Sequence, residues 1–163
     1  MAARTYKLSK RADLEKISAG LCEAFPNHHC YSHHFRRSFL DSFDWRLFNA
    51  GYSLIADKHD QGFELQLYNL SNQQLVTQVY QHALPRLRQD LGESKLATLL
   101  GPILDIRALL KHIELDVQQQ RIQITNNSGK TQAEILLERC KANSSDTPHQ
   151  FKQLRHISTL KNE

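Results

Sequence analysis

Five side chains that can bind soft or borderline metal ions lie within seven residues of one another. They are His28, His29, Cys30, His33 and His34. Side chains two residues apart on a strand share a face, so one face would carry His28, Cys30 and His34 and the other the remaining two. Either set could supply ligands to zinc. A zinc motif normally includes a second ligand pair, and none with matching spacing occurs. We therefore predict an exposed histidine-rich strand and no physiological metal.

Nucleophilic and phosphate-cradling motifs are missing from the sequence. It contains no G-x-S-x-G elbow, and no local signature would activate Cys22. The six glycines are dispersed and form no phosphate-binding loop. Hydrolysis through a serine or cysteine nucleophile is not expected.

The most informative segment is residues 35–57, which predicts two strands joined by a capped turn. Residues 36–40 have the character of a strand end. Asp44 is placed to accept backbone N–H bonds at the start of a short helical turn. Gly51 would end that turn in the left-handed conformation, and residues 52–56 alternate as a second strand.

The rest of the chain predicts an α+β protein dominated by antiparallel sheet, with a few flanking helices. Leu14, Ile17, Leu21 and Phe25 form a helical stripe, and a second helical region, residues 94–110, should be interrupted at Gly101 and Pro102. The other expected strands are residues 4–8, 28–40, 63–68, 75–80, 113–117, 122–124 and 131–139, with a bulge or turn near residues 118–120 and a hairpin turn at residues 126–130. After these, residues 141–149 are typical of a linker, and the spacing of Phe151, Leu154, Ile157 and Leu160 predicts a short helix.

One phrase in the middle of the chain resembles a known family. It reads Phe39, Leu40, Asp41, Ser42, then Asp44, Arg46, Leu47, Ala50, Gly51, Ser53 and Leu54. This motif resembles that of the CYTH domains of the triphosphate tunnel superfamily, and in particular that of the CYTH-like domains that precede CHAD domains in bacterial proteins. The resemblance extends over residues 4–139 and implies an antiparallel β-barrel that encloses a tunnel. It divides the chain into a CYTH-like tunnel domain, residues 1–140, and a linker with a short C-terminal helix, residues 141–163.

The sequence departs from this family where the family does its chemistry. Active members carry Glu-x-Glu-x-Lys on the first strand, and here Ala3 and Thr5 stand in place of the carboxylates while Lys7 is kept. The Arg-x-Arg that usually follows the turn is replaced by Ile55 and Asp57. In active members the carboxylates would hold Mg or Mn, and the basic residues would neutralise the phosphates.

A few residues could still represent the family's site. Lys7, Arg36 and Arg37 are the candidate anion-binding residues. Glu134 and Glu138 share a strand face and could be a remnant acidic site, although the interpretation we prefer makes them solvated residues. No catalytic residue and no metal ligand is predicted.

Composition limits the remaining functional classes. The chain has 163 residues, a net charge of +4 and a pI near 9.0, but its basic residues are scattered, so we expect no nucleic-acid partner. No apolar run is long enough to span a membrane. The N-terminus lacks the apolar core of a signal peptide, which favours a cytoplasmic location. The three cysteines fit no disulfide framework and are expected to be reduced thiols.

The leading hypothesis is a CYTH-like domain with a degenerate active site. Three functional alternatives follow from it. In the first it is a non-catalytic module that needs no cofactor and binds polyphosphate, another phosphorylated molecule, or a CHAD domain. The second is a divergent triphosphatase that depends on Mg or Mn. The third is a structural interaction module that binds no small anion.

Overall fold

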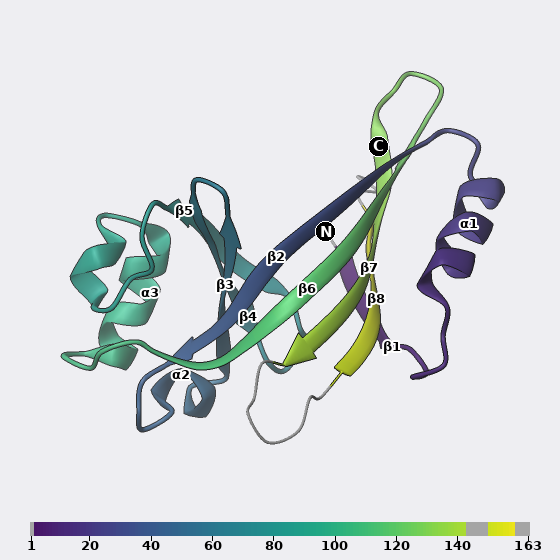
Figure 1. Cartoon of the computed structure of the whole chain (residues 1–163). Helices are drawn as coiled ribbons and strands as arrows, with labels where there is room; N and C mark the ends of the chain where they lie inside the picture. Colours follow the sequence, from purple (N-terminus) through teal and green to yellow (C-terminus); the bar gives the residue numbers. More distant parts are fainter. Residues whose placement is uncertain (1, 143–149, 159–163) are drawn as a thin grey trace. The chain divides into compact units, whose positions relative to one another are not determined.

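The structure, a computed structural model, describes residues 2–142 and 150–158. Two compact units divide the chain. Unit 1 comprises residues 1–34 and 116–163, and unit 2 comprises residues 35–115. Two long strands, β2 (His28–Asp41) and β6 (Leu110–Thr125), contribute residues to both units (Figure 1).

Unit 1 contains β1 (Ala2–Lys7), α1 (Leu14–Ala24), β7 (Thr131–Ala142), β8 (Gln150–Ser158) and the adjoining parts of β2 and β6. The side chain of Asp13 caps α1, and Pro26 follows soon after its end. Ile17 and Leu21 of α1 pack against a small buried cluster formed by Ile122, Ile135 and Leu137. The predicted apolar stripe is therefore confirmed from Leu14 to Leu21, whereas its fourth member, Phe25, follows the helix and is 39% exposed.

The C-terminal segment is a strand and not the short helix that its spacing predicts. Residues 150–158 form β8, which pairs antiparallel with β1 on one side and β7 on the other. From Gln153 to Ser158 the backbone of β8 pairs with both neighbours, and this hydrogen bonding outweighs a local preference for helix. Of the four apolar residues on which the helix prediction depends, Leu160 lies outside the described residues.

Unit 2 contains α2 (Arg46–Asn49), β3 (Tyr52–His59), β4 (Gly62–Asn69), β5 (Leu75–Gln81), the 3-10 helix η1 (Arg88–Leu91) and α3 (Lys95–Leu104). Strands β2, β3, β4 and β5 pair antiparallel in sequence order. One face of this sheet packs against α3 and η1, and the core consists of leucines such as Leu54 and Leu65 from the strands and Leu96 and Leu100 from α3. The predicted hairpin of β4 and β5 is confirmed.

Helix α3 continues through Pro102, so the expected interruption at Gly101 and Pro102 is wrong. Proline removes one intrahelical hydrogen bond. Leu100 and Leu104, on either side of it, are fully buried in the core of unit 2, and their packing holds the helix together. The helix ends at Asp105, whose φ of 54° is left-handed.

The strands hydrogen-bond in the order β1-β8-β7-β6-β2-β3-β4-β5. The described strands thus form an open antiparallel sheet, with β1 and β5 as its edge strands, and together with the helices they make an α+β fold. The closed barrel implied by the family resemblance is therefore not observed. The apolar face of the unit 2 sheet packs against α3 and η1. No described helix is long and apolar enough to cross a membrane.

Candidate functional site

The centre of the candidate site in unit 2 is a buried ion pair between β2 and β3. Arg37 lies directly opposite Asp57 in the antiparallel register. Its Nε and Nη2 atoms donate to the two carboxylate oxygens of Asp57 at 2.8 and 2.9 Å. Both side chains are about 95% buried, at 4% and 5% exposure. Such a two-pronged pair is the strongest arrangement of these groups.

This pair changes the role of both residues. Asp57 stands where the family resemblance implies a phosphate-binding arginine, and its carboxylate satisfies the guanidinium that β2 does supply. An arginine whose positive charge is already matched by a buried carboxylate has little capacity left for a phosphate. Ile55, the other replaced position, is also buried and apolar. The buried positions Arg37, Ile55 and Asp57 are therefore unsuited to hold a polyanion.

The other two candidate anion-binding residues lie apart from this pair. The side chain of Arg36 is 60% exposed and has Glu114 4.0 Å away. Lys7 is an exposed residue of β1, where its backbone pairs with Gln153. Arg36 lies opposite Lys58 in the register of β2 with β3, and the Glu114 carboxylate near its guanidinium also pairs with Lys111 at 2.8 Å.

The turn after β2 is stabilised by Asp41 and not, as expected, by Asp44. The buried carboxylate of Asp41 accepts hydrogen bonds from the backbone N–H groups of Ser42, Leu47 and Phe48 at 2.7, 2.9 and 3.0 Å. Asp44 instead accepts from the Ser42 hydroxyl at 2.7 Å and from Arg46 Nε at 3.0 Å. The hydrogen bond from Ser42 is the main reason that the pKa of Asp44 is lowered. Gly51 has the expected left-handed φ, 82°.

In unit 1, the two candidate acidic residues of β7 have different environments. Glu138 is fully buried and accepts a 2.7 Å hydrogen bond from Nε2 of the buried Gln119. Glu134 is half-buried, with Gln123 Nε2 at 3.3 Å and Arg121 Nε at 3.5 Å. Our preferred interpretation, that both are solvated, is therefore wrong for Glu138.

The two glutamates do not fit a shared Mg or Mn ion. Four residues along a strand separate their Cα atoms by about 13 Å, whereas carboxylates that share one Mg lie on an octahedron with ligand distances of about 2.1 Å. Glu134 also has a guanidinium beside it. The first strand offers no carboxylate at Ala3 or Thr5. These residues do not form the metal centre of an active tunnel enzyme.

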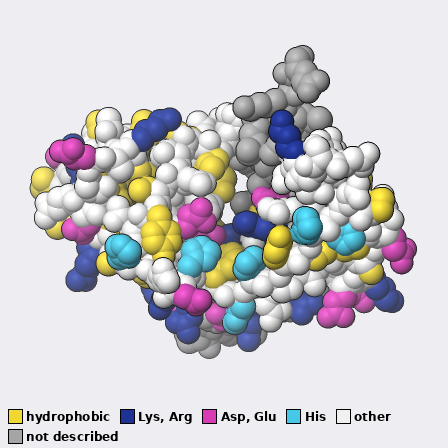
Figure 2. All heavy atoms as spheres, turned by 90° about the horizontal axis from the view of Figure 1, so that it is seen from above, with side chains coloured by type: hydrophobic (Ala, Val, Ile, Leu, Met, Phe, Trp, Pro, Cys, Tyr) yellow, Lys and Arg dark blue, Asp and Glu magenta, His cyan; other side chains and the backbone are white. Residues whose placement is uncertain are grey.

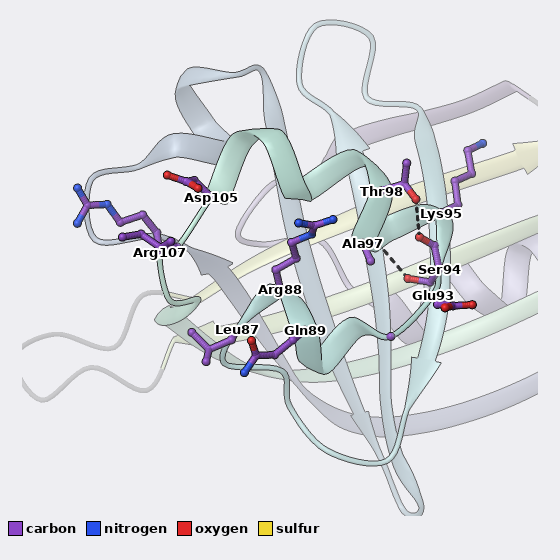
Figure 3. A pocket seen from close by; sticks show the side chains of 12 residues that line it. Leu87, Arg88, Gln89, Glu93, Ser94, Lys95, Ala97, Thr98, Asp105 and Arg107 are labelled. Carbon is purple, nitrogen blue, oxygen red and sulfur yellow. Dashed lines mark hydrogen bonds between the residues drawn. The ribbon is translucent and has the colours of Figure 1, made fainter.

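A pocket in unit 2 is lined by cations that the sequence did not single out, and one of them, Arg107, lies 3.6 Å from the carboxylate of Asp44. It has a volume of about 810 Å³ and lies between η1, the start of α3 and residues 105–107 (Figure 3). Arg88, Lys95 and Arg107 line it, together with the acidic Glu93 and Asp105. Their positions in sequence, on three different elements, give no local pattern that would have predicted the cluster.

The pocket includes the N-terminal end of α3. Ser94 caps this end, and its hydroxyl accepts from the backbone N–H of Ala97 at 3.0 Å (Figure 3). The positive end of a helix dipole favours negative charge. Arg88 lies close against α3, because a Cβ added at Gly101 would meet Arg88 Nε at 2.7 Å. The pocket is therefore the part of unit 2 whose chemistry is most suited to an anion.

The histidine-rich start of β2 is largely exposed, as predicted. His29, Cys30, His33 and His34 are exposed and His28 is half-buried, and histidine side chains are visible at the surface in Figure 2. The structure places His28 and Cys30 beside Cys22 of α1. The sequence did not predict that Cys22 lies beside these two residues, because this depends on the direction of the turn between α1 and β2.

Together, the open antiparallel sheet and the flanking helices define an antiparallel α+β fold. Two solved structures support this assignment. A candidate adenylate cyclase from Bacillus halodurans is 14% identical over 97% of this chain and 80% of its own length, with a TM-score of 0.62. A candidate adenylyl cyclase from Hippeastrum, described as having a dominant triphosphatase activity, is 13% identical over 97% of this chain and 79% of its own, with a TM-score of 0.59. No protein-family model and no curated protein matches the chain. At these identities the similarity establishes the fold alone.

Proposed function

We propose that this chain is a CYTH-like domain that does not hydrolyse triphosphates and acts as a binding module for phosphorylated anions. The observation that carries the first half of the proposal is the buried pair of Arg37 and Asp57. Hydrolysis of a triphosphate requires metal ligands and cations that are available to the phosphates. Here the buried arginine of β2 is matched by a carboxylate, and Ala3 and Thr5 supply no metal ligand.

The second half of the proposal places the anion in the pocket between η1 and α3. Its volume of about 810 Å³ is within the range of small-molecule sites. Arg88 and Lys95 would neutralise phosphate oxygens there, and the N-terminal end of α3 would add backbone donors. Glu93 and Asp105 limit the total charge, so we expect moderate affinity that weakens with salt.

Calorimetry with tripolyphosphate and with long-chain polyphosphate tests the binding site. A variant with both Arg88→Gln and Lys95→Gln should bind roughly 100-fold or more weakly, since each of the two charged hydrogen bonds is worth about 1.5–3 kcal/mol. Lys58→Gln, which removes an exposed lysine of β3 outside the pocket, is the matched control and should bind as the wild type does. Equal affinity in the double variant and the control would place the anion elsewhere, and no measurable binding by the wild type would favour a purely structural module.

A divergent triphosphatase is the second candidate function. The triphosphatase activity of the Hippeastrum neighbour favours it, and so does the complete burial of Glu138, a carboxylate held by Gln119 on a strand where the family resemblance implies metal-binding glutamates. Release of phosphate that requires Mg or Mn and is abolished by Glu138→Gln would establish it. The CHAD partner, bacterial origin and cytoplasmic location remain predictions of the sequence.

A further inference from the structure

The geometry of unit 1 points to a zinc-binding site formed by Cys22, His28 and Cys30, which we propose as a property separate from anion binding. The two sulfur atoms and a ring nitrogen of His28 all lie within 4.8 Å of one another. The Sγ atoms of Cys22 and Cys30 are 3.1 Å apart. Two thiolates and an imidazole are a typical ligand set for zinc.

Two elements position these side chains. Cys22 lies in the last turn of α1, and His28 and Cys30 are at the start of β2. Because His28 and Cys30 are two residues apart on a strand, they point to the same face. Pro26 and its neighbours turn the chain between α1 and β2, and this turn brings that face against Cys22.

The hydrogen bond of His28 determines which of its ring nitrogens is free to bind a metal. Its Nδ1 atom lies 2.7 Å from the backbone carbonyl oxygen of Phe25. A neutral ring that donates from Nδ1 to this carbonyl carries its lone pair on Nε2. Metal-binding histidines generally donate their second N–H to a carbonyl or carboxylate in this way, and the bond fixes the orientation of the ring.

The spacing of the two sulfurs fits a metal better than a disulfide. Tetrahedral zinc with Zn–S bonds of about 2.3 Å separates its sulfurs by about 3.8 Å, which requires an opening of about 0.7 Å. A disulfide at about 2.05 Å requires the sulfurs to approach by about 1 Å, and it would leave His28 without a role.

The described residues supply three ligands, so the fourth tetrahedral position is open to water. Cys30 is exposed, and Cys22 and His28 are half-buried, so an ion can enter from solvent. The bound zinc would join the end of α1 to the start of β2 within unit 1.

Zinc titration of the full chain, kept reduced with a phosphine, tests the site. We expect one zinc per chain, and a thiolate-to-metal charge-transfer band when cobalt replaces zinc. Cys22→Ser and Cys30→Ser should each weaken binding about 100-fold or more, and His28→Gln about tenfold. His33→Gln, at an exposed histidine of the same strand, should leave the affinity unchanged.

A measurement on the wild type covers the case in which a cysteine variant fails to fold. Zinc should protect two of the three thiols from alkylation, and mass spectrometry should identify these as Cys22 and Cys30. The proposal is overturned if the reduced wild type binds no stoichiometric zinc, or if binding survives both serine substitutions.

Discussion

Asp57→Asn should be among the most destabilising single substitutions in the chain. The change keeps the size of the side chain but leaves Arg37, which is 4% exposed, beside a neutral amide. Removal of one partner from a buried ion pair typically costs about 3–5 kcal/mol, because the remaining charge stays desolvated. For a domain of this size that corresponds to a fall in Tm of roughly 6–20 °C.

The assay is equilibrium unfolding in urea, followed by the fluorescence of the single tryptophan. Trp45 lies in unit 2, as the ion pair does, and its ring centroid is 4.1 Å from that of His112. It therefore reports directly on the unit that contains the substitution. Circular dichroism provides a second probe, and agreement between the two supports two-state analysis.

A double substitution separates the buried charge from the shape of the site. Arg37→Met combined with Asp57→Leu removes both charges, and apolar replacement of buried pairs is often neutral or stabilising. We expect the double variant to be more stable than either single variant. If Asp57→Asn costs less than about 0.5 kcal/mol, a value typical of surface substitutions, the pair does not have the energetic role that its geometry indicates.

Three further predictions concern the turn after β2 and its surroundings. Asp41→Ala should lower the free energy of unfolding by about 2 kcal/mol, the upper range for a lost helix cap, because three backbone N–H groups lose their acceptor; urea unfolding measures this. Gly51→Ala should destabilise the protein by about 1–2 kcal/mol, since the φ of Gly51 is 82°. Gly20→Ala should instead stabilise it by about 0.5–1 kcal/mol, because Gly20 lies in helix α1 and a Cβ added there would meet nothing within 4 Å. Similar effects of the two substitutions would contradict the assigned backbone conformations. The lowered pKa of Asp44 means that its ionised form is the stabilised one in the folded state, so its contribution is present above the pKa of the unfolded chain and lost as pH falls through the folded value. The stability difference between the wild type and Asp44→Asn should therefore shrink from neutral to acidic pH, and a difference independent of pH would refute this assignment.

Local pattern was sufficient to predict most of the fold. The positions of strands β3 and β4, the apolar stripe of α1 as far as Leu21 and the left-handed Gly51 follow from local features, and each is found where expected. The end of the chain failed because β8 depends on hydrogen bonds to β1 and β7, which are distant in sequence. Pro102 misled for a related reason, since its helix is held by tertiary packing around it.

The candidate site was less predictable than the fold. The loss of Glu-x-Glu-x-Lys and the presence of Asp57 could be noted in the sequence, but the partner of Asp57 depends on the register of β2 with β3. The burial of Glu138 likewise depends on Gln119 of a different strand. The pocket of unit 2 and the approach of Cys22 to Cys30 require turns whose direction has no signature in the sequence.

The most direct test of the central claim is a phosphate-release assay with the purified chain, tripolyphosphate or ATP, and Mg or Mn. We expect no metal-dependent release above the background of protein-free controls, for the wild type and for Glu138→Gln alike. Metal-dependent release by the wild type that disappears in Glu138→Gln, a variant confirmed to be folded by circular dichroism, would contradict the non-catalytic account and establish a triphosphatase.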